Sequence, residues 1–597
     1  MGAITDQLTA ILSKYDESQD PLDESTIYTE INSLASEKLE AEEAERLYLM
    51  AETMAFGFIE DYQDKRTGWD TYFGPMAVLP DESGRWYETP SIRLVTAEII
   101  DYWLQRAQQA KSPVLKMRYA DLVWDFTHKV TGEAPDIQAA QIAIDSALMI
   151  VQEKRFGHEI FAVKKLNRAL TIALSTSDTE RVQQAISAIT ALEDEIGQDT
   201  NIGLWGFSFD TLLKNKKIPL TEKQRSKIIS DLEARLQRFI TNPDYSFSVY
   251  AAENAALRLV QFYQKQNDHP QIQRVLRAYG NLVVVSVDQN RALAGLASVE
   301  KLWDIYFSHG MRKDAEALAP LLEKLGKRTD EEMQSFTHEI KVPTEELEKY
   351  YAQFFDKSLD EALIRIAVRF VPDPEKIETQ IKDLAKEAPL TFLITHSLMD
   401  REGRTIARIG SIEEDLDGHI IHQTSQNLQF ESPFLNELFK RTYSQYQPSL
   451  EDLMDYLYQS PIFQAEDRFI IQAGIEAYRQ ENHLVAAHLL IPQIENILRY
   501  LLQTSGGSIY KQGRNGGMFL KTLDEILREE VVRIALGNDV AQYLQIILTD
   551  PRGWNAPNNV CHGMAPPSLF GPVLTDRLFH VLLVLALIRN QPPAPEG

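Results

Sequence analysis

The segment SIRLVTAEIIDYWLQRAQQA, residues 91–110, sets the helical character of the chain. Its apolar residues Ile92, Val95, Ile99 and Trp103 recur three or four positions apart, which places their side chains on one face of an α-helix. A Lys-Ser-Pro triplet then interrupts the pattern, because proline breaks a continuing helix. The segment therefore predicts an amphipathic helix that ends at a short break.

The same periodicity extends away from this segment. The following stretch VLKMRYADLVWDFTHKV places Leu115, Tyr119, Leu122 and Phe126 on one face of a second helix. Comparable helical patterns continue to about residue 385, and strand patterns are nearly absent there. The sequence thus predicts a mainly α fold.

Three stretches resemble helical hairpins of the tetratricopeptide type, at residues 253–280, 297–326 and 473–502. Each has an amphipathic helix ending in an aromatic residue, a short polar turn and a second helix with small residues. Stacked hairpins bury a continuous core and expose long concave surfaces. We therefore expect an N-terminal α-solenoid body whose surface binds a protein partner.

The helical pattern is interrupted at residues 388–424. Apolar residues there flank a tight turn at Gly403, which predicts a β-hairpin. We expect four parts. They are an N-terminal helical domain at residues 1–200, a helical-repeat-like middle domain at 201–385, a connector with the β-hairpin at 386–430 and a C-terminal helical domain at 431–597.

Composition limits the classes of function. The 597 residues suggest roughly two to four domains. Because the net charge of −26 repels nucleic acid at long range, any RNA-binding role needs a local basic pocket. A single cysteine excludes an intramolecular disulfide and a cysteine-cluster zinc site, and it fits a reducing cytoplasm. We expect no metal and no cofactor.

Membrane insertion is not expected either. The first residues lack the basic start and long apolar core of a secretory signal. The most apolar run, LFHVLLVLALI at residues 578–588, is shorter than the roughly 20 residues that span a bilayer.

A functional argument starts at TDPRGWNAPNNVCHGMAPP, residues 549–567. Pro557 suits the first turn of a helix, Asn555 is a good cap before it, and Gly563 is a typical terminator. These residues predict a helix of about two turns.

Asn558 and His562 are four positions apart in this helix and therefore share a face. The free N–H groups at a helix start attract phosphate, and an imidazole titrates near neutral pH, as backbone cleavage of RNA by its own 2′-hydroxyl requires. The alternative is a structural histidine that donates a hydrogen bond to a buried carbonyl.

Cys561, adjacent to His562, points about 100° away from it, so we expect a small buried thiol rather than a catalytic dyad.

The segment GWNAPNNVCHG, residues 553–563, resembles the Gly-x-Asn-x-Arg-Asn-x-x-x-His-Gly signature of a family of bacterial and eukaryotic proteins. This family includes the eukaryotic endoplasmic-reticulum membrane-associated RNA degradation protein. The flanking stretches LLIPQIENILRYLL, KTLDEIL and LGNDVAQYLQIILTDPRG, an apolar closing helix and the hairpin SLMDREGRTIARIG agree with it. The resemblance covers roughly residues 390–590, and it is weaker in KSPVLKMRYADLVWD.

The C-terminal part of that family is similar to HEPN domains, helical bundles that are often metal-independent ribonucleases with an Arg-x(4–6)-His motif. They commonly act as dimers in toxin–antitoxin, antiviral and RNA-processing systems. The resemblance implies that His562 is the acid or base and that Asn558 positions the histidine or a phosphate oxygen. It also implies an RNA substrate and a homodimer.

The sequence departs from the signature where Pro557 replaces the arginine. Arginine would clamp the phosphate as charge builds in the transition state, and losing such a clamp commonly costs about 10²- to 10³-fold in rate. Three cations elsewhere are candidates to replace it: Arg552 just upstream, Arg499, and Arg514. Arg514 lies in the glycine-rich loop at residues 505–517, whose alternative interpretation is a connector between helices.

Arg499 belongs to a polar stripe with His488 and Glu495 on one helix face. The alternative for Glu495 and Arg499 is an ion pair between residues four apart.

Two hypotheses of function follow from the sequence. The first is an HEPN-like RNA-binding protein or endoribonuclease in host defence or stress. The second is a non-enzymatic helical-repeat scaffold or regulator with an inactive HEPN-like domain.

Overall fold

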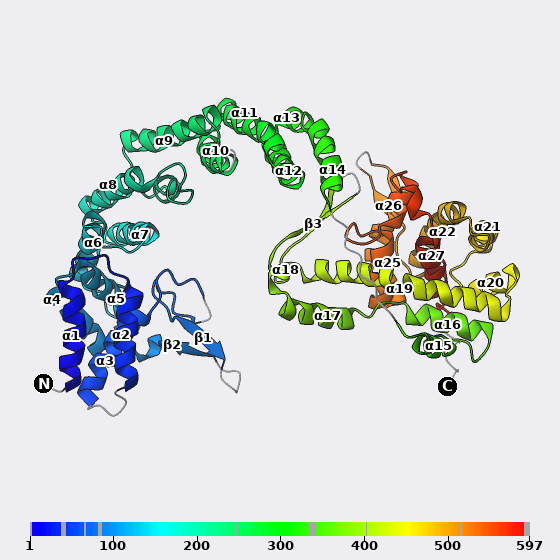
Figure 1. Ribbon diagram of the computed structural model, residues 1–597, viewed down its shortest axis with the longest axis horizontal. Coiled ribbons are helices and arrows are strands. Elements are labelled where there is room, and N and C mark those ends of the chain that lie inside the picture. Colours follow the sequence, from blue (N-terminus) through cyan, green and yellow to red (C-terminus); the bar gives the residue numbers. More distant parts are fainter. Residues whose placement is uncertain are drawn as a thin grey trace. The chain divides into compact units, whose positions relative to one another are not determined.

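The computed structural model describes residues 3–37, 43–64, 67–80, 86–244, 247–333, 342–400, 403–513 and 516–589. It divides into two compact units, Met1–Ala317 and Leu318–Gly597. Helices dominate both units, and the strands of the described residues form three small antiparallel pairs (Figure 1). The predicted mainly α fold with a small β-hairpin is confirmed.

Unit 1 is built from helices that pack in chain order. Successive helices contact each other from α4 through α8 and again from α9 through α13, and the helices follow one another in a row in Figure 1. Contacts also join α4 with α6 and α6 with α8, as in helical-repeat bodies. Its elements are α1 (Ala3–Glu17), α2 (Glu24–Glu37), α3 (Glu43–Gly57), β1 (Ala77–Pro80), β2 (Trp86–Thr89), α4 (Ala97–Gln109), α5 (Pro113–Thr131), α6 (Ile137–Gln152), α7 (Glu159–Ser175), α8 (Thr179–Ile196), α9 (Glu222–Thr241), α10 (Ser248–Lys265), α11 (His269–Ser286), α12 (Ala292–Ser308) and α13 (Arg312–Glu316).

In the segment at residues 91–110 the α-helix begins only at Ala97, after one turn of 3-10 helix at Ile92–Leu94. The side chain of Thr96 accepts a hydrogen bond from the Ile99 N–H and caps α4, so the preceding residues lie outside the helix. Trp103 is fully buried. The four residues predicted for one face of α5 are fully buried as well, which confirms the pattern: Leu115, Tyr119, Leu122 and Phe126.

The repeat-like stretches form helical hairpins with one difference. The first is α10 and α11, and the third is the pair α21 (Arg468–Arg479) and α22 (His483–Thr504). In the second, the expected partner of α12 is divided into the short α13 and α14 (Ala319–Glu332). Proline at position 320 favours a new helix start there.

Unit 2 gathers its remaining helices around one apolar helix. Its other elements are α15 (Thr344–Ala352), α16 (Leu359–Arg369), α17 (Pro374–Glu387), α18 (Pro389–Leu393), β3 (His396–Met399), β4 (Thr405–Ile409), α19 (Leu416–Tyr446), α20 (Leu450–Leu457), β5 (Tyr510–Gln512), β6 (Met518–Leu520), α23 (Leu523–Arg528), α24 (Glu530–Leu536), α25 (Asn538–Leu548), α26 (Ala556–Cys561) and α27 (Pro572–Leu585).

The predicted β-hairpin is the antiparallel pair β3–β4, with His396 opposite Ile409. Two further hairpins were not predicted. The pair β1–β2 lies in a region expected to be helical, and β5–β6 lies in the glycine-rich stretch interpreted as a connector.

Helix α27 is the centre of unit 2. Every residue from Leu574 to Leu585 is buried, and the helix packs against α16, α19 and α22. An apolar surface on all sides is typical of a buried core helix. No helix in the described part of the chain is both long and apolar enough to cross a membrane.

Two buried polar residues on α27 join neighbouring helices. Arg577 donates hydrogen bonds to the carbonyls of Phe370 and Leu428, at 3.5 and 3.1 Å. The ring of His580 lies 2.6 Å from the Tyr543 hydroxyl and 3.1 Å from the Ala367 carbonyl. Burial, together with the charge of Arg577, lowers the pKa of His580 to about 3, so this ring stays neutral.

The four-part division of the chain stays a prediction. Its last boundary, at 430/431, falls inside α19, a single helix of 31 residues.

Candidate functional site

The predicted short helix is present as α26, Ala556–Cys561, with Pro557 in its first turn. Asn555 stands at the N-cap position, but its backbone is left-handed, with φ 45°, and its side chain makes no capping hydrogen bond. The expected side-chain cap is therefore wrong. His562 ends the helix, and Gly563 follows with φ +71°, as predicted for a terminator.

Asn558 and His562 are both exposed to solvent. The helix is held instead by Ala556 and Val560, which are buried. The side chain of the neighbouring Asn559 also donates a 3.0 Å hydrogen bond to the Trp554 carbonyl. The alternative of a buried, structural His562 is thus wrong, and its imidazole is open to ligands.

Cys561 is exposed, contrary to the buried thiol expected from the sequence. It is the last residue of α26, and the buried face of that helix is formed by Ala556 and Val560. Partial burial raises the pKa of the thiol, and the carboxylate of Glu495 raises it further. A thiol of raised pKa is a weak nucleophile at neutral pH.

Arg552 is enclosed by carboxylates. Its guanidinium donates to both oxygens of Asp550, at 3.0 and 2.9 Å, and to Asp417 at 3.2 Å. Asp415 lies 3.6 Å away. Three acids surround one cation, so a phosphate meets net negative charge at this position.

The polar side chains on α22 also have partners within the protein. Arg499 forms an ion pair with Glu495 four positions earlier, as the alternative interpretation predicted. His488 is exposed, stacks on Phe570 with ring centroids 5.5 Å apart, and lies 2.8 Å from the Leu484 carbonyl. Helix α22 does pack against α26, so the stripe and His562 belong to neighbouring elements. Arg514 lies outside the described residues.

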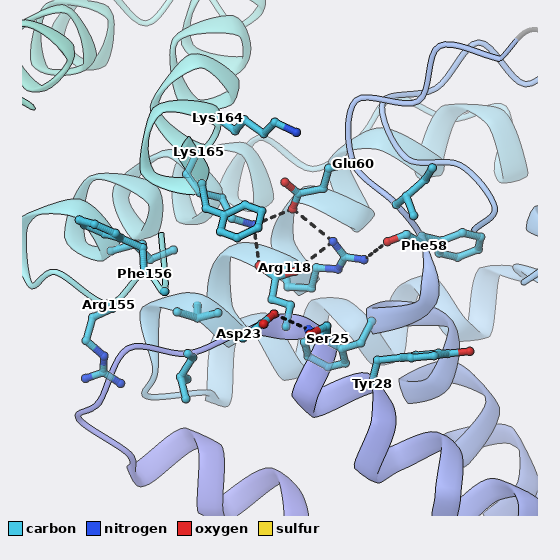
Figure 2. A pocket seen from close by; sticks show the side chains of 18 of the residues that line it. Asp23, Ser25, Tyr28, Phe58, Glu60, Arg118, Arg155, Phe156, Lys164 and Lys165 are labelled. Atoms are coloured by element: carbon cyan, nitrogen blue, oxygen red, sulfur yellow. Dashed lines mark hydrogen bonds and ion pairs between the residues drawn. The ribbon is translucent and has the colours of Figure 1, made fainter. Parts of the chain in front are cut away.

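A second candidate site, not predicted from the sequence, is a pocket of about 380 Å³ in unit 1. Figure 2 shows a charged network among the residues that line it. The ammonium of Lys165 donates 2.6 Å hydrogen bonds to Glu24 and to Glu60. Arg118 lies 3.1 Å from Glu24 and 3.2 Å from Glu60.

Backbone contacts fix Arg118 in this network. Its guanidinium donates to the carbonyls of Ala55, at 2.5 Å, and Phe58. Burial raises the pKa of the Glu60 carboxyl, but the charges of Lys165 and Arg118 outweigh burial and bring that pKa to about 2. The Glu60 carboxyl therefore stays ionised at neutral pH.

The wall of the pocket is largely apolar and aromatic. Three of its apolar side chains remain well exposed: Ile59 at 40%, Met76 at 48% and Phe161 at 51%. The remaining apolar lining residues are Leu22, Tyr28, Phe56, Phe58, Val114, Ile150 and Phe156. A concave, mostly apolar surface with a few convergent polar groups is typical of a small-molecule site.

Residues 13–185 match a family described as "Domain of unknown function (DUF7380)". This range includes every residue that lines the pocket in unit 1 and none of the candidate residues in unit 2. No curated protein and no solved structure matches the chain.

The sequence held one signal for the pocket. Arg118 immediately precedes the buried Tyr119 on α5, a helix that is buried on most sides. A cation embedded in such a helix needs a partner. Its partners Glu24 and Glu60 come from other elements, so the sequence pattern did not identify them.

Proposed function

We propose that this chain is a non-catalytic helical-repeat protein that binds a protein partner, with a C-terminal unit that resembles HEPN ribonucleases and does not cleave RNA. One observation carries the proposal. The two described cations that could replace the missing motif arginine, Arg552 and Arg499, are both paired with carboxylates. Among the described residues, neither of these two arginines is therefore free to supply, beside the exposed His562, the cation that phosphate cleavage needs.

Exposed apolar side chains on the helices of unit 1 support the partner-binding part of the proposal. Tyr250, Val285 and Phe307 are each more than half exposed, at 59%, 59% and 55%. Large apolar side chains left in solvent are frequent at protein-interaction surfaces.

A metal-independent endoribonuclease is the second candidate, and the exposure of His562 and Asn558 favours it. Under this proposal the substrate is RNA, and a second copy of the chain supplies the missing cation, as the resemblance to dimeric HEPN domains implies.

The test uses labelled tRNA and single-stranded RNA in the presence of a chelator. We expect no cleavage by the wild-type chain above the level of the His562→Ala variant. Cleavage by the wild type that is lost in His562→Ala would overturn the non-catalytic proposal and support the ribonuclease.

The Pro557→Arg variant restores the motif arginine five positions before His562. If the unit derives from a ribonuclease, this variant gains cleavage that a Pro557→Arg, His562→Ala double variant lacks. Failure of Pro557→Arg to cleave would count against the ribonuclease resemblance and leave the scaffold function in place.

A further inference from the structure

The pocket in unit 1 has the size and walls of a ligand site. It is formed by the start of α2, the end of α3, one face of α5, the loop between α6 and α7, and the first turns of α7. Pockets of about 300 to 1,000 Å³ hold small organic molecules. Flat rings stack well on aromatic side chains, and the lining includes five: Tyr28, Phe56, Phe58, Phe156 and Phe161.

The charged network that lines the pocket has one hydrogen-bond acceptor that the protein leaves open. Lys165 and Arg118 both contact the Oε1 atom of Glu60. Its Oε2 atom has no partner among the described residues. Because the carboxyl stays ionised, Oε2 only accepts hydrogen bonds, so a ligand group that binds to it is an N–H or O–H donor.

A donor stands on the same side of the pocket. Lys164, next to Lys165 on α7, is exposed and has no ion-pair partner in the part of the chain that the structure describes. In Figure 2 its ammonium points toward the Glu60 side, whereas Arg155 points away from the network. Arg155 is held elsewhere, by Gln19 at 2.9 Å and by the Ser18 carbonyl.

We propose that this pocket binds a planar, amino-substituted nitrogen heterocycle, the chemistry shared by free nucleobases, nucleosides and nucleotides. The ring lies against the aromatic wall, its amino group donates to Glu60 Oε2, and an adjacent ring nitrogen or carbonyl accepts from Lys164. An edge that pairs a donor with an acceptor is what distinguishes a nucleobase from a simple aromatic ring. This inference is independent of the proposed function, because it concerns unit 1 and is tested by binding.

The test is isothermal titration calorimetry on the full chain with adenosine, guanosine and cytidine. Their free bases and 5′-monophosphates identify which source of the ring is preferred. For the base that binds, we expect the matched ligand without the amino group to bind about tenfold or more weakly, because a hydrogen bond to a charged group is lost. For adenosine that ligand is purine riboside.

Three variants locate the site. Lys164→Met and Phe161→Ala should each weaken binding about tenfold, through the lost hydrogen bond and the lost stacking surface. Lys129→Met changes an exposed lysine of α5 that does not line the pocket, and it should alter affinity less than about twofold. All three replace exposed side chains, so the fold is retained.

Absence of binding by all three bases in all three forms at millimolar concentration would overturn the inference. Equal affinity for adenosine and purine riboside would also overturn it where adenosine is the ligand, as would binding that survives both Lys164→Met and Phe161→Ala. None of these results bears on RNA cleavage by the C-terminal unit.

Discussion

Adjacent residues on one helix can have opposite roles, and Lys164 and Lys165 are such a pair. The side chain of Lys165 is 10% exposed and bridges two carboxylates, whereas that of Lys164 is exposed and has no ion-pair partner among the described residues. Removing one member of a buried charge network leaves its partners uncompensated, while removing an exposed lysine changes little.

Lys165→Met should therefore lower the free energy of unfolding of unit 1 by about 3–5 kcal/mol. Lys164→Met should change it by less than about 0.5 kcal/mol. Urea denaturation followed by far-ultraviolet circular dichroism measures both values. Equal effects of the two substitutions would show that the buried network does not stabilise the fold.

The network also makes stability depend on pH through Glu60. Its carboxyl has a pKa of about 2 in the folded chain against an ordinary value of 4.5. A lowered folded pKa gives stability that is fully present above pH 4.5 and is lost as the pH falls toward 2. The difference in unfolding free energy between the wild type and Glu60→Gln should therefore be largest above pH 4.5 and should shrink in acid. A difference that grows in acid would contradict the assigned ion pairs.

At the scale of the element, the turn of the β3–β4 hairpin approaches α14 closely at two glycines, Gly403 and Gly326. A Cβ atom on Gly403 would lie 2.3 Å from the Gly326 Cα and 2.5 Å from its carbonyl oxygen. Gly403 also has φ +73°, which disfavours any side chain. Glycine is thus required at this position for two separate reasons.

Gly403→Ala should destabilise unit 2 by about 3 kcal/mol or more, since steric overlap adds to the backbone cost. Gly563 is the matched control, because its φ of +71° is nearly the same and nothing lies within 4 Å of an added Cβ. Gly563→Ala should cost only about 1–2 kcal/mol. Thermal unfolding of the two variants compares them, and similar losses would argue against the close approach of the hairpin to α14.

The sequence predicted those elements whose signals are local. The helical period identified α5, and the turn at Gly403 identified β3–β4. The start of α4 was missed because the cap at Thr96 overrides a continuous apolar pattern. The pairing of Glu495 with Arg499 was foreseen as an alternative because the two residues are one helical turn apart.

The pocket was missed because its parts are distant in sequence. Lys165 and Glu24 are 141 positions apart, and no local pattern relates them. Arg552 shows the same limit: its charge suggested a phosphate contact, and only the folded chain brings the carboxylates of Asp415 and Asp417 to it.

At the scale of the whole molecule, each unit has its own core, with Trp103 buried in unit 1 and Leu582 in unit 2. Chains with separate cores commonly unfold in more than one step. Differential scanning calorimetry should therefore show two transitions. Trp103→Ala should lower the temperature of one and Leu582→Ala that of the other, each by several degrees for a loss of about 3–5 kcal/mol. A single transition shifted by both substitutions would contradict two independent cores.

The position of α27 has a consequence for how the chain is made. Its contacts reach back 207 positions to Phe370 and 213 positions to Ala367. Helices α4 to α8 of unit 1 each pack against a helix made just before or after them, so most of these contacts can form during synthesis. The apolar faces of α16, α19 and α22 must wait until α27 emerges. Nascent unit 2 therefore exposes apolar surface until its last helix is made, which is the condition under which chaperones bind a chain.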